Sequence, residues 1–117
     1  SQEDRIENNR RVANVAKILF DAGILPIVST ISPNKASRNF AKSLFQNDEF
    51  KLVYVNTSIE ECIRRDPKKL YSSKSKKVKN ITGINSNYDI PEEYDLKLDT
   101  EVLSVLQCAN RVVKLIT

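Results

Sequence analysis

The sequence predicts an α/β protein in which helices cover both faces of a parallel sheet. Three short segments, at residues 24–30, 51–57 and 96–100, are predicted as strands, and the first is a continuous apolar run of the kind that is buried on both faces of a parallel sheet. Segments with helical periodicity separate these predicted strands, as expected of the crossover connections between parallel strands. The sequence opens on a helix without a preceding strand, so we expect one side of this sheet to be incomplete.

A first helix is predicted over residues 2–22. Ser1 followed by Asp4 resembles a capping box in which Asp takes the place of Glu. Apolar residues then recur at helical spacing as far as Gly23, a typical helix end: Val12, Val15, Leu19 and Ala22. We expect the row made of Val12, Val15 or Ala16, and Leu19 to face the core.

The later elements follow from local signals. Pro26 cannot donate a ladder hydrogen bond, which weakens the first strand as a central one. After ISPN the helical pattern returns, with an apolar side made of Phe40, Leu44 and Phe45. Ser58 and Glu61 form an S-x-x-E capping box that opens a helix, and Pro67 helps to end it. The stretch 102–116 predicts a last amphipathic helix.

Composition restricts the chemistry. The 117 residues suit one domain with one core. The sequence has no run of about 18 apolar residues that would suggest a membrane segment, and no apolar leader that would suggest export. Histidine is absent, which excludes Ser-His and Cys-His nucleophile pairs and most transition-metal sites. Cys62 and Cys108 have no CxxC spacing, so neither a disulfide framework nor a zinc cluster is indicated, and we expect a reducing cytoplasm.

The positive charge is concentrated in residues 64–79, which contain eight Lys or Arg and a single acidic residue, Asp66. A solvated surface, a nucleic-acid contact and a mobile lid over a nucleotide are the three interpretations of such a run. Only Tyr71 and Tyr88 flank it, so it lacks an aromatic platform for bases, and the rest of the chain is slightly acidic. The lid therefore ranks above nucleic-acid binding.

Ligands of open parallel sheets bind beyond the carboxyl ends of the strands, here residues 29–33, 56–58 and 99–101. Arg5 and Asn8 share a face at the start of the first helix and point toward that edge, unless they only form a capping network. Ser32 lies between a strand end and a helix start. Its hydroxyl fits an anion contact, although a lone Ser-Pro is more often a helix cap or a turn residue.

Six segments, read in order, resemble the successive signatures of adenylylsulfate kinases: DRIENNRR, FDAGI, ISP, RRDPKKLY, KNITGINSNYDIP and LDT. The resemblance implies one kinase domain over residues 1–117, of the three-layer αβα P-loop nucleoside triphosphate hydrolase type, with a basic lid at about 65–90. It also implies transfer of the ATP γ-phosphoryl group to the 3′-hydroxyl of adenosine 5′-phosphosulfate in sulfate activation, with ATP and Mg²⁺ as cofactors.

The resemblance carries site residues with it. It implies that the substrate contacts are Arg5, Ile6, Glu7, Asn8, Ile31, Ser32, Lys68, Asn80 and Ile81. It implies that the ATP contacts are Arg65, Thr100 and Leu103, and no metal ligand is assigned. The family's serine of the ISP motif, here Ser32, has been assigned as a phosphoserine intermediate. Direct in-line transfer requires no such species, so we treat Ser32 as a substrate contact first.

Departures from the family pattern qualify this expectation. Lys69 replaces a glycine of the lid motif, and Ile81 replaces a phenylalanine that would stack on the substrate adenine. The only glycines are Gly23 and Gly83, so no G-x-x-x-x-G-K-[ST] loop exists in these residues, and the family's D-G-D segment would precede Ser1. We therefore expect that these 117 residues alone do not catalyse the reaction.

Two further matters stay open at this point. A nucleotide-binding pseudokinase or regulatory module without phosphoryl transfer is the alternative to a kinase. The resemblance is also compatible with a homodimer or with a fusion to ATP sulfurylase, whereas neither nucleic acid nor a membrane is expected as a partner.

Overall fold

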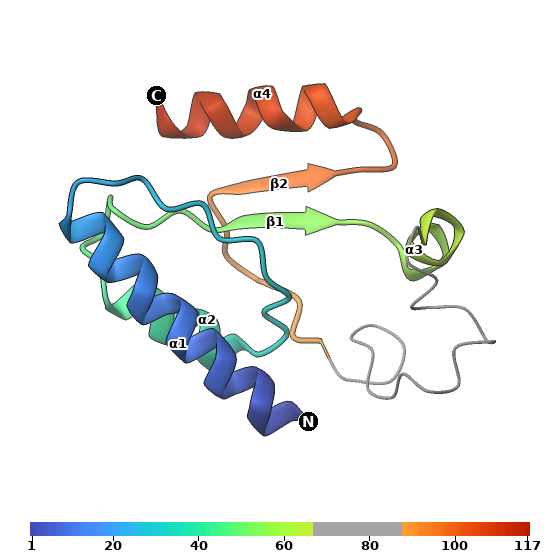
Figure 1. Ribbon diagram of the computed structural model, residues 1–117. Helices are drawn as coiled ribbons and strands as arrows, with labels where there is room; N and C mark the ends of the chain where they lie inside the picture. The colour runs from blue at the N-terminus through green and yellow to red at the C-terminus, as the bar shows by residue number, and fades with distance from the viewer. Residues whose placement is uncertain (67–87) are drawn as a thin grey trace. The chain divides into compact units, whose positions relative to one another are not determined.

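The computed structural model describes residues 1–66 and 88–117, and has the predicted α/β character (Figure 1). The chain divides into two compact units, which are described separately. Unit 1 comprises Ser1–Phe50 and Asn87–Ile90, and unit 2 comprises Lys51–Ser86 and Pro91–Thr117. Residues 67–87 of these ranges lie outside the described part.

Unit 1 begins with α1, Gln2–Asp21, which confirms the first predicted helix. The Ser1 hydroxyl accepts a hydrogen bond from the Asp4 N–H at 3.1 Å, and the reciprocal bond completes the predicted capping box. The helix stops at Gly23, whose φ of +88° lies in the left-handed region that glycine adopts without a Cβ penalty.

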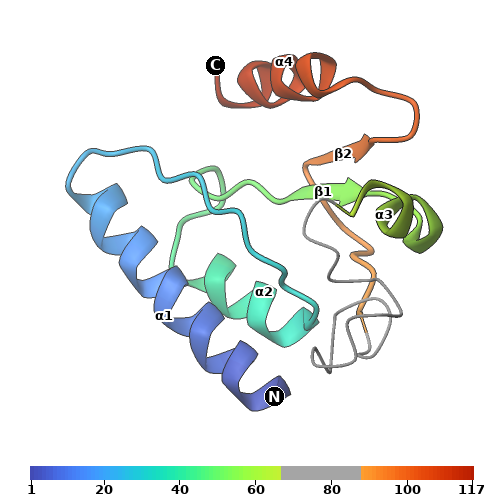
Figure 2. The same ribbon diagram turned by 45° about the vertical axis from the view of Figure 1, so that its right-hand side comes forward.

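The second helix, α2, Lys35–Ser43, packs beside α1 (Figures 1 and 2). Asn34 caps it, since its side-chain oxygen accepts from the backbone N–H groups of Ala36 and Ser37 at 2.8 and 3.3 Å. Ala13 and Ala16 of α1 are 6% and 8% exposed. Their small side chains allow close packing of the helix on this face.

The core-facing row of α1 differs from the predicted one. Val15 and Leu19 are 55% and 37% exposed, whereas Ala13 and Ala16 are buried. The apolar pattern of α1 is wide enough to serve two faces, and periodicity alone does not tell which face receives a neighbour. Within unit 1, α2 packs against α1. Of the two buried alanines, Ala16 belongs to the expected row, whereas Ala13 lies one position beyond Val12.

The predicted strand at 24–30 is wrong for the described structure, in which this segment forms no strand. Ile24, Leu25, Ile27 and Val28 are each at least half exposed, and Ile27 reaches 77%. A strand requires a hydrogen-bonded neighbour, and Pro26 lacks an N–H to contribute. The segment has strand composition, but no described strand pairs with it.

Unit 2 contains the two strands of the described sheet, β1, Val53–Asn56, and β2, Leu96–Asp99. They pair in parallel, from Val53 opposite Leu96 to Asn56 opposite Asp99, and confirm two of the predicted strands. Leu98 is the buried centre at 4% exposure. The parallel direction places the carboxyl ends of both strands at one edge.

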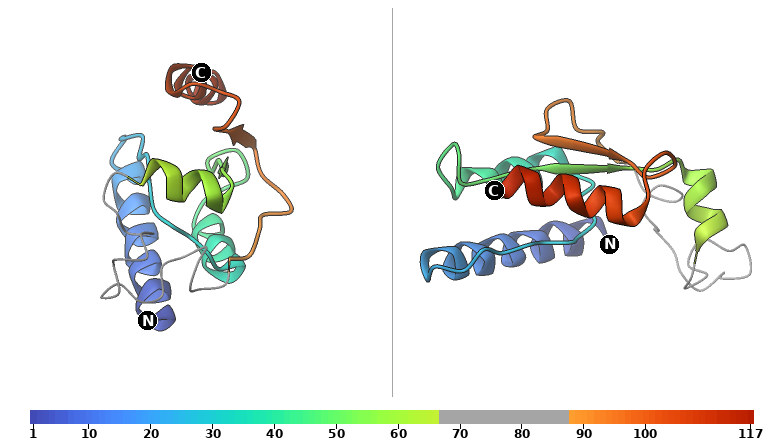
Figure 3. Two further views of the ribbon diagram at one scale, coloured as in Figure 1. Left: turned by 90° about the vertical axis from the view of Figure 1, so that its right-hand side faces the viewer. Right: turned by 90° about the horizontal axis from the view of Figure 1, so that it is seen from above.

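Two helices accompany these strands. The first, α3, Ile59–Arg65, begins at its cap Ser58 and ends before Pro67, as predicted. The last helix, α4, Val105–Ile116, contacts β2 and runs alongside the two strands (Figure 3). It begins later than residue 102 because a capping box of Ser104 and Gln107 fixes its start.

The apolar arc of α4 is only half covered. One edge of the arc is half-buried and consists of Cys108, Val112 and Leu115. The adjoining edge is exposed and consists of Val105, Leu106, Ala109, Val113 and Ile116. No helix in the described ranges is both long enough and apolar enough to cross a membrane.

Candidate functional site

Side chains at the carboxyl ends of β1 and β2 pair across the sheet for three consecutive positions. The register of Asn56 opposite Asp99 continues past both strands, so that each pair is 43 residues apart in sequence. The pairs are Asn56 with Asp99 at 2.7 Å, the hydroxyls of Thr57 and Thr100, and Ser58 with Glu101 at 2.8 Å. Two of the predicted strand-end segments therefore meet, as expected of parallel strands.

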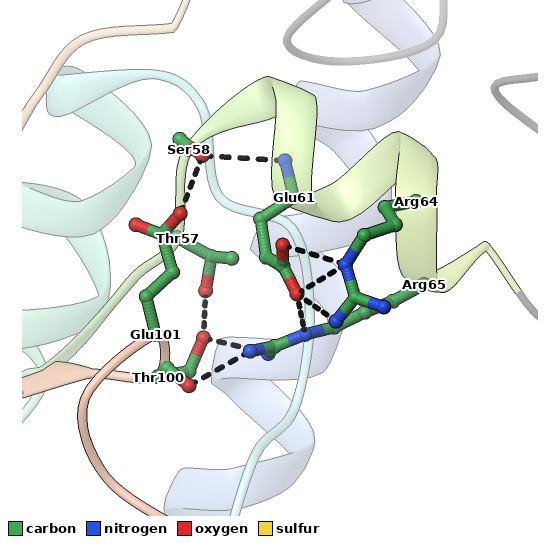
Figure 4. Close-up of polar contacts among 7 residues, drawn as sticks. All are labelled: Thr57, Ser58, Glu61, Arg64, Arg65, Thr100 and Glu101. Carbon is green, nitrogen blue, oxygen red and sulfur yellow. Dashed lines mark hydrogen bonds and ion pairs between the residues drawn. The ribbon is translucent and has the colours of Figure 1, made fainter.

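Arg65, at the end of α3, is anchored to this edge (Figure 4). Its Nη1 donates to the Thr100 hydroxyl at 3.0 Å, and its Nη2 donates to the Thr100 carbonyl at 2.9 Å. Its Nε donates to Glu61 at 2.7 Å. These bonds use three of the five N–H groups of the guanidinium, and the side chain is 42% exposed. Two predicted ATP contacts, Arg65 and Thr100, are thus in direct contact with each other.

The Glu61 carboxylate forms ion pairs with both arginines of α3. It accepts from Arg64 as well as Arg65, and the hydrogen bond from Arg64 is the largest cause that lowers the pKa of Glu61 to about 2. The Ser58 hydroxyl accepts from the Glu61 N–H at 3.2 Å, which confirms the cap. The second bond of the predicted capping box, from the Ser58 N–H to the Glu61 carboxylate, is not formed, because this carboxylate pairs with Arg64 and Arg65 instead.

The thiol of Cys62 follows Glu61 on α3. Burial raises the pKa of this thiol above its ordinary value, so it stays protonated at neutral pH. A protonated thiol is a poor nucleophile. Polar and charged groups therefore dominate the possible chemistry of this edge.

Unit 1 contains the predicted substrate residues at the start of α1. Arg5 is half-buried, whereas Asn8 is exposed and Ile6 is 41% exposed. Asn9 reaches the Ile31–Ser32 segment, since its Nδ2 donates to the Ile31 carbonyl at 3.4 Å. Asn9 was not predicted, although it lies four residues after Arg5 and so shares its face.

Glu7 makes a local ion-pair network on α1. Arg10 donates to it at 2.8 and 2.6 Å, and Arg11 donates at 3.0 Å. These bonds, with Arg10 as the larger cause, lower the pKa of Glu7 to about 2. Glu7 is therefore ionised, and its described contacts are to its own helix.

Ser32 lies in a loop whose backbone accepts a hydrogen bond from a buried arginine. Arg38 of α2 is 9% exposed and donates to the backbone carbonyls of Ser32 and Asp89, each at 2.5 Å. The Ser32 hydroxyl itself lies 3.2 Å from that of Thr30. Arg38 and Asp89 were missed by the sequence analysis, because nothing in the local pattern links residues 51 positions apart.

The remaining predicted residues divide into two groups. Leu103 is half-buried in a turn, where its N–H donates to the Asp99 carbonyl at 2.9 Å. Lys68, Asn80 and Ile81 lie outside the described residues. Among residues 1–66 and 88–117 no three His, Cys, Asp or Glu side chains gather into a metal site.

Comparison with known proteins supports one family. The profile of the family described as Adenylylsulphate kinase matches residues 1–99. An adenylyl-sulfate kinase of Bacteroides thetaiotaomicron is 41% identical over 117 residues, covering 99% of this chain and 58% of the relative. The bifunctional enzyme NodQ of Rhizobium sp. strain N33 is 48% identical over 101 residues, covering 86% of this chain and 16% of that enzyme.

A solved structure agrees with this result. The Mycobacterium tuberculosis APS kinase CysC, determined in complex with AMPPNP and APS, superimposes with a TM-score of 0.87 at 35% identity. The match covers 99% of this chain and 68% of that one. The chain thus spans 58% of the length of the Bacteroides relative and has the α/β fold of these kinases. On these matches, the chain belongs to the adenylylsulfate kinase family.

Proposed function

We propose that this chain is the part of an adenylylsulfate kinase that binds the acceptor and one side of ATP. The reaction transfers the γ-phosphoryl group of ATP to the 3′-hydroxyl of adenosine 5′-phosphosulfate and gives 3′-phosphoadenylyl sulfate. The observation that carries the proposal is the anchoring of Arg65 on Thr100, since two residues chosen as ATP contacts are 35 positions apart and meet in the fold.

The chemistry of phosphoryl transfer fits this arrangement. Charge develops on phosphoryl oxygens in the transition state, and catalysis depends on positioning and on charge neutralisation. A guanidinium held on one edge by Glu61 and Thr100 loses little further freedom when it binds a phosphate. We assign Arg65 to the ATP phosphates, with Thr100 and Leu103 beside the nucleotide.

The acceptor is assigned to unit 1. Arg5 and Asn8 offer a cation and an amide to the phosphosulfate nucleotide, and Ser32 offers a hydroxyl at the start of α2. Ile6, Glu7 and Ile31 are the other acceptor contacts assigned in unit 1. Lys68, Asn80 and Ile81, which lie outside the described residues, are assigned to the acceptor on the family resemblance alone. We assign no phosphoserine to Ser32, because in-line transfer between the two substrates needs none.

Other parts of the proposal concern the whole protein. Mg²⁺ would neutralise the negative charge of the ATP phosphates. We infer a cytoplasmic enzyme. The match to a bifunctional enzyme supports a second catalytic domain such as ATP sulfurylase, and a homodimer is the other proposed assembly.

The test is a kinase assay on the protein made from its complete reading frame. Formation of 3′-phosphoadenylyl sulfate from ATP and adenosine 5′-phosphosulfate is expected, and Arg65→Met should raise the KM for ATP more than that for the acceptor. An active protein in which Arg65→Met changes neither constant would contradict the assignment of Arg65. Nucleotide binding without product would support the pseudokinase alternative instead.

A further inference from the structure

Unit 1 contains a polar cluster, built around Arg38 and Asp89, that the proposed reaction does not yet use. Arg38 donates to the Ser32 and Asp89 carbonyls. The Asp89 N–H donates to the Pro33 carbonyl at 2.7 Å, and the Asp89 carboxylate accepts from the Lys35 N–H at 2.9 Å. We call these four hydrogen bonds the Arg38–Asp89 clasp.

The clasp fixes the Ser32 loop where it joins α2. Its bonds hold the loop at Ser32 and Pro33, before α2, and at Lys35, in the first turn of α2. Pro33 is buried, and its ring restricts the backbone further. Every bond that Asp89 makes in the clasp crosses more than 50 residues of sequence, so the loop is held by tertiary contacts rather than by its own turn.

Directed hydrogen bonds compensate for the burial of the Arg38 guanidinium. A buried cation requires hydrogen-bond acceptors, and the two carbonyl oxygens provide them. The ring of Tyr88 lies 5.7 Å from the guanidinium carbon and adds a cation–π contact. The guanidinium donates directly to the Ser32 carbonyl, so its positive charge lies close to the Ser32 loop and favours an anion there.

We propose that Arg38 is a positioning residue for the acceptor: it sets the place of the Ser32 loop and supplies positive potential to the phosphosulfate group. The inference rests on the proposed function, because it takes Ser32 as a contact of the acceptor. It goes beyond that function in naming a residue that touches neither substrate and in limiting its effect to one of them.

The test compares steady-state kinetics of three variants in the protein made from its complete reading frame. Arg38→Met should raise the KM for adenosine 5′-phosphosulfate by about tenfold or more, while the KM for ATP changes less than about twofold. The KM of Arg38→Lys for adenosine 5′-phosphosulfate should lie between those of the wild type and Arg38→Met. An ammonium keeps the charge, but it cannot span two carbonyls as the planar guanidinium does. Lys42→Met, which removes an exposed charge from the same helix, is the matched control and should resemble the wild type.

A second measurement does not depend on turnover. Amide hydrogen exchange at residues 30–35 should be faster in Arg38→Lys than in the wild type, with no change in the middle of α1. If Arg38→Met does not fold, Arg38→Lys and Tyr88→Leu provide the same comparison. Equal increases in the KM values for ATP and for the acceptor would overturn the inference but not the proposed function. Unchanged KM values together with unchanged amide hydrogen exchange would do the same. A wild-type protein that makes no product overturns the proposed function, and the inference falls with it.

Discussion

The contact between Arg65 and Thr100 makes a residue-scale prediction. Thr100→Val removes the hydroxyl that accepts from Arg65 and pairs with Thr57, but it retains the Thr100 carbonyl. We expect the KM for ATP to rise about three- to tenfold, the value of one ordinary hydrogen bond, because Arg65 keeps its bonds to the Thr100 carbonyl and to Glu61. Arg65→Met should cost more, because it removes the charge itself.

Arg64→Met is the control for this pair. Arg64 contacts the same carboxylate of Glu61, and its side chain is 71% exposed. Its loss should therefore leave the KM for ATP within about twofold of the wild type. A larger effect from Arg64 than from Thr100 would contradict the assigned role of the anchor.

The pKa of Glu61 makes a second prediction at this scale. It is lowered from 4.5 to about 2, so the folded protein binds this proton more weakly than the unfolded chain does. The stabilisation from the Glu61–arginine contacts is therefore complete above about pH 4.5 and is lost as the pH falls toward 2. Carboxyl-carbon NMR should show that Glu61 stays ionised from pH 8 down to about pH 3.5. A midpoint near 4.5 would mean that the arginines do not hold it.

Single residues were predictable where the chemistry is local. The caps at Ser1 and Ser58 follow from spacings of three residues, and the structure has both. Arg38 had no such signal. It lies in a short helix among lysine and serine, and its role depends on two backbone carbonyls, those of Ser32 and of Asp89, which is 51 residues away.

Helix α4 makes the prediction at the scale of an element. Leu115 belongs to the half-buried edge of its apolar arc, and Leu106 to the edge that is 70% exposed. Leu115→Ala should lower the free energy of unfolding by about 1–2 kcal/mol, less than a fully buried leucine, whereas Leu106→Ala should change it by less than about 0.5 kcal/mol. Chemical denaturation of the two variants compares identical substitutions on one helix. Equal losses would show that both edges are covered in solution.

The segment at 24–30 shows the opposite case at this scale. Its composition is that of a buried strand, yet Ile27 is 77% exposed, and no described strand pairs with it. Strand formation depends on a neighbour, while helix formation satisfies its own backbone hydrogen bonds. This difference explains why every predicted helix is present and one predicted strand is not.

The last prediction concerns the chain as a whole. Residues 1–117 alone should form no 3′-phosphoadenylyl sulfate, because they contain no G-x-x-x-x-G-K-[ST] loop to hold the ATP phosphates. In a coupled assay, these residues should give the rate of a blank, and the protein from the complete reading frame should be active. Turnover by the 117 residues alone would show that phosphate binding in this family member differs from the expected loop.

The sequence by itself determined the α/β class, the helices with their caps, two parallel strands and, through six ordered motifs, the adenylylsulfate kinase family. These features depend on neighbours in sequence or on short motifs. The tertiary structure alone decided that Arg65 rests on Thr100, that Asn9 rather than Asn8 reaches Ile31, and that Arg38 holds the Ser32 loop. Each of these contacts joins elements distant in sequence, and the fold selects among several side chains that local periodicity makes equally suitable.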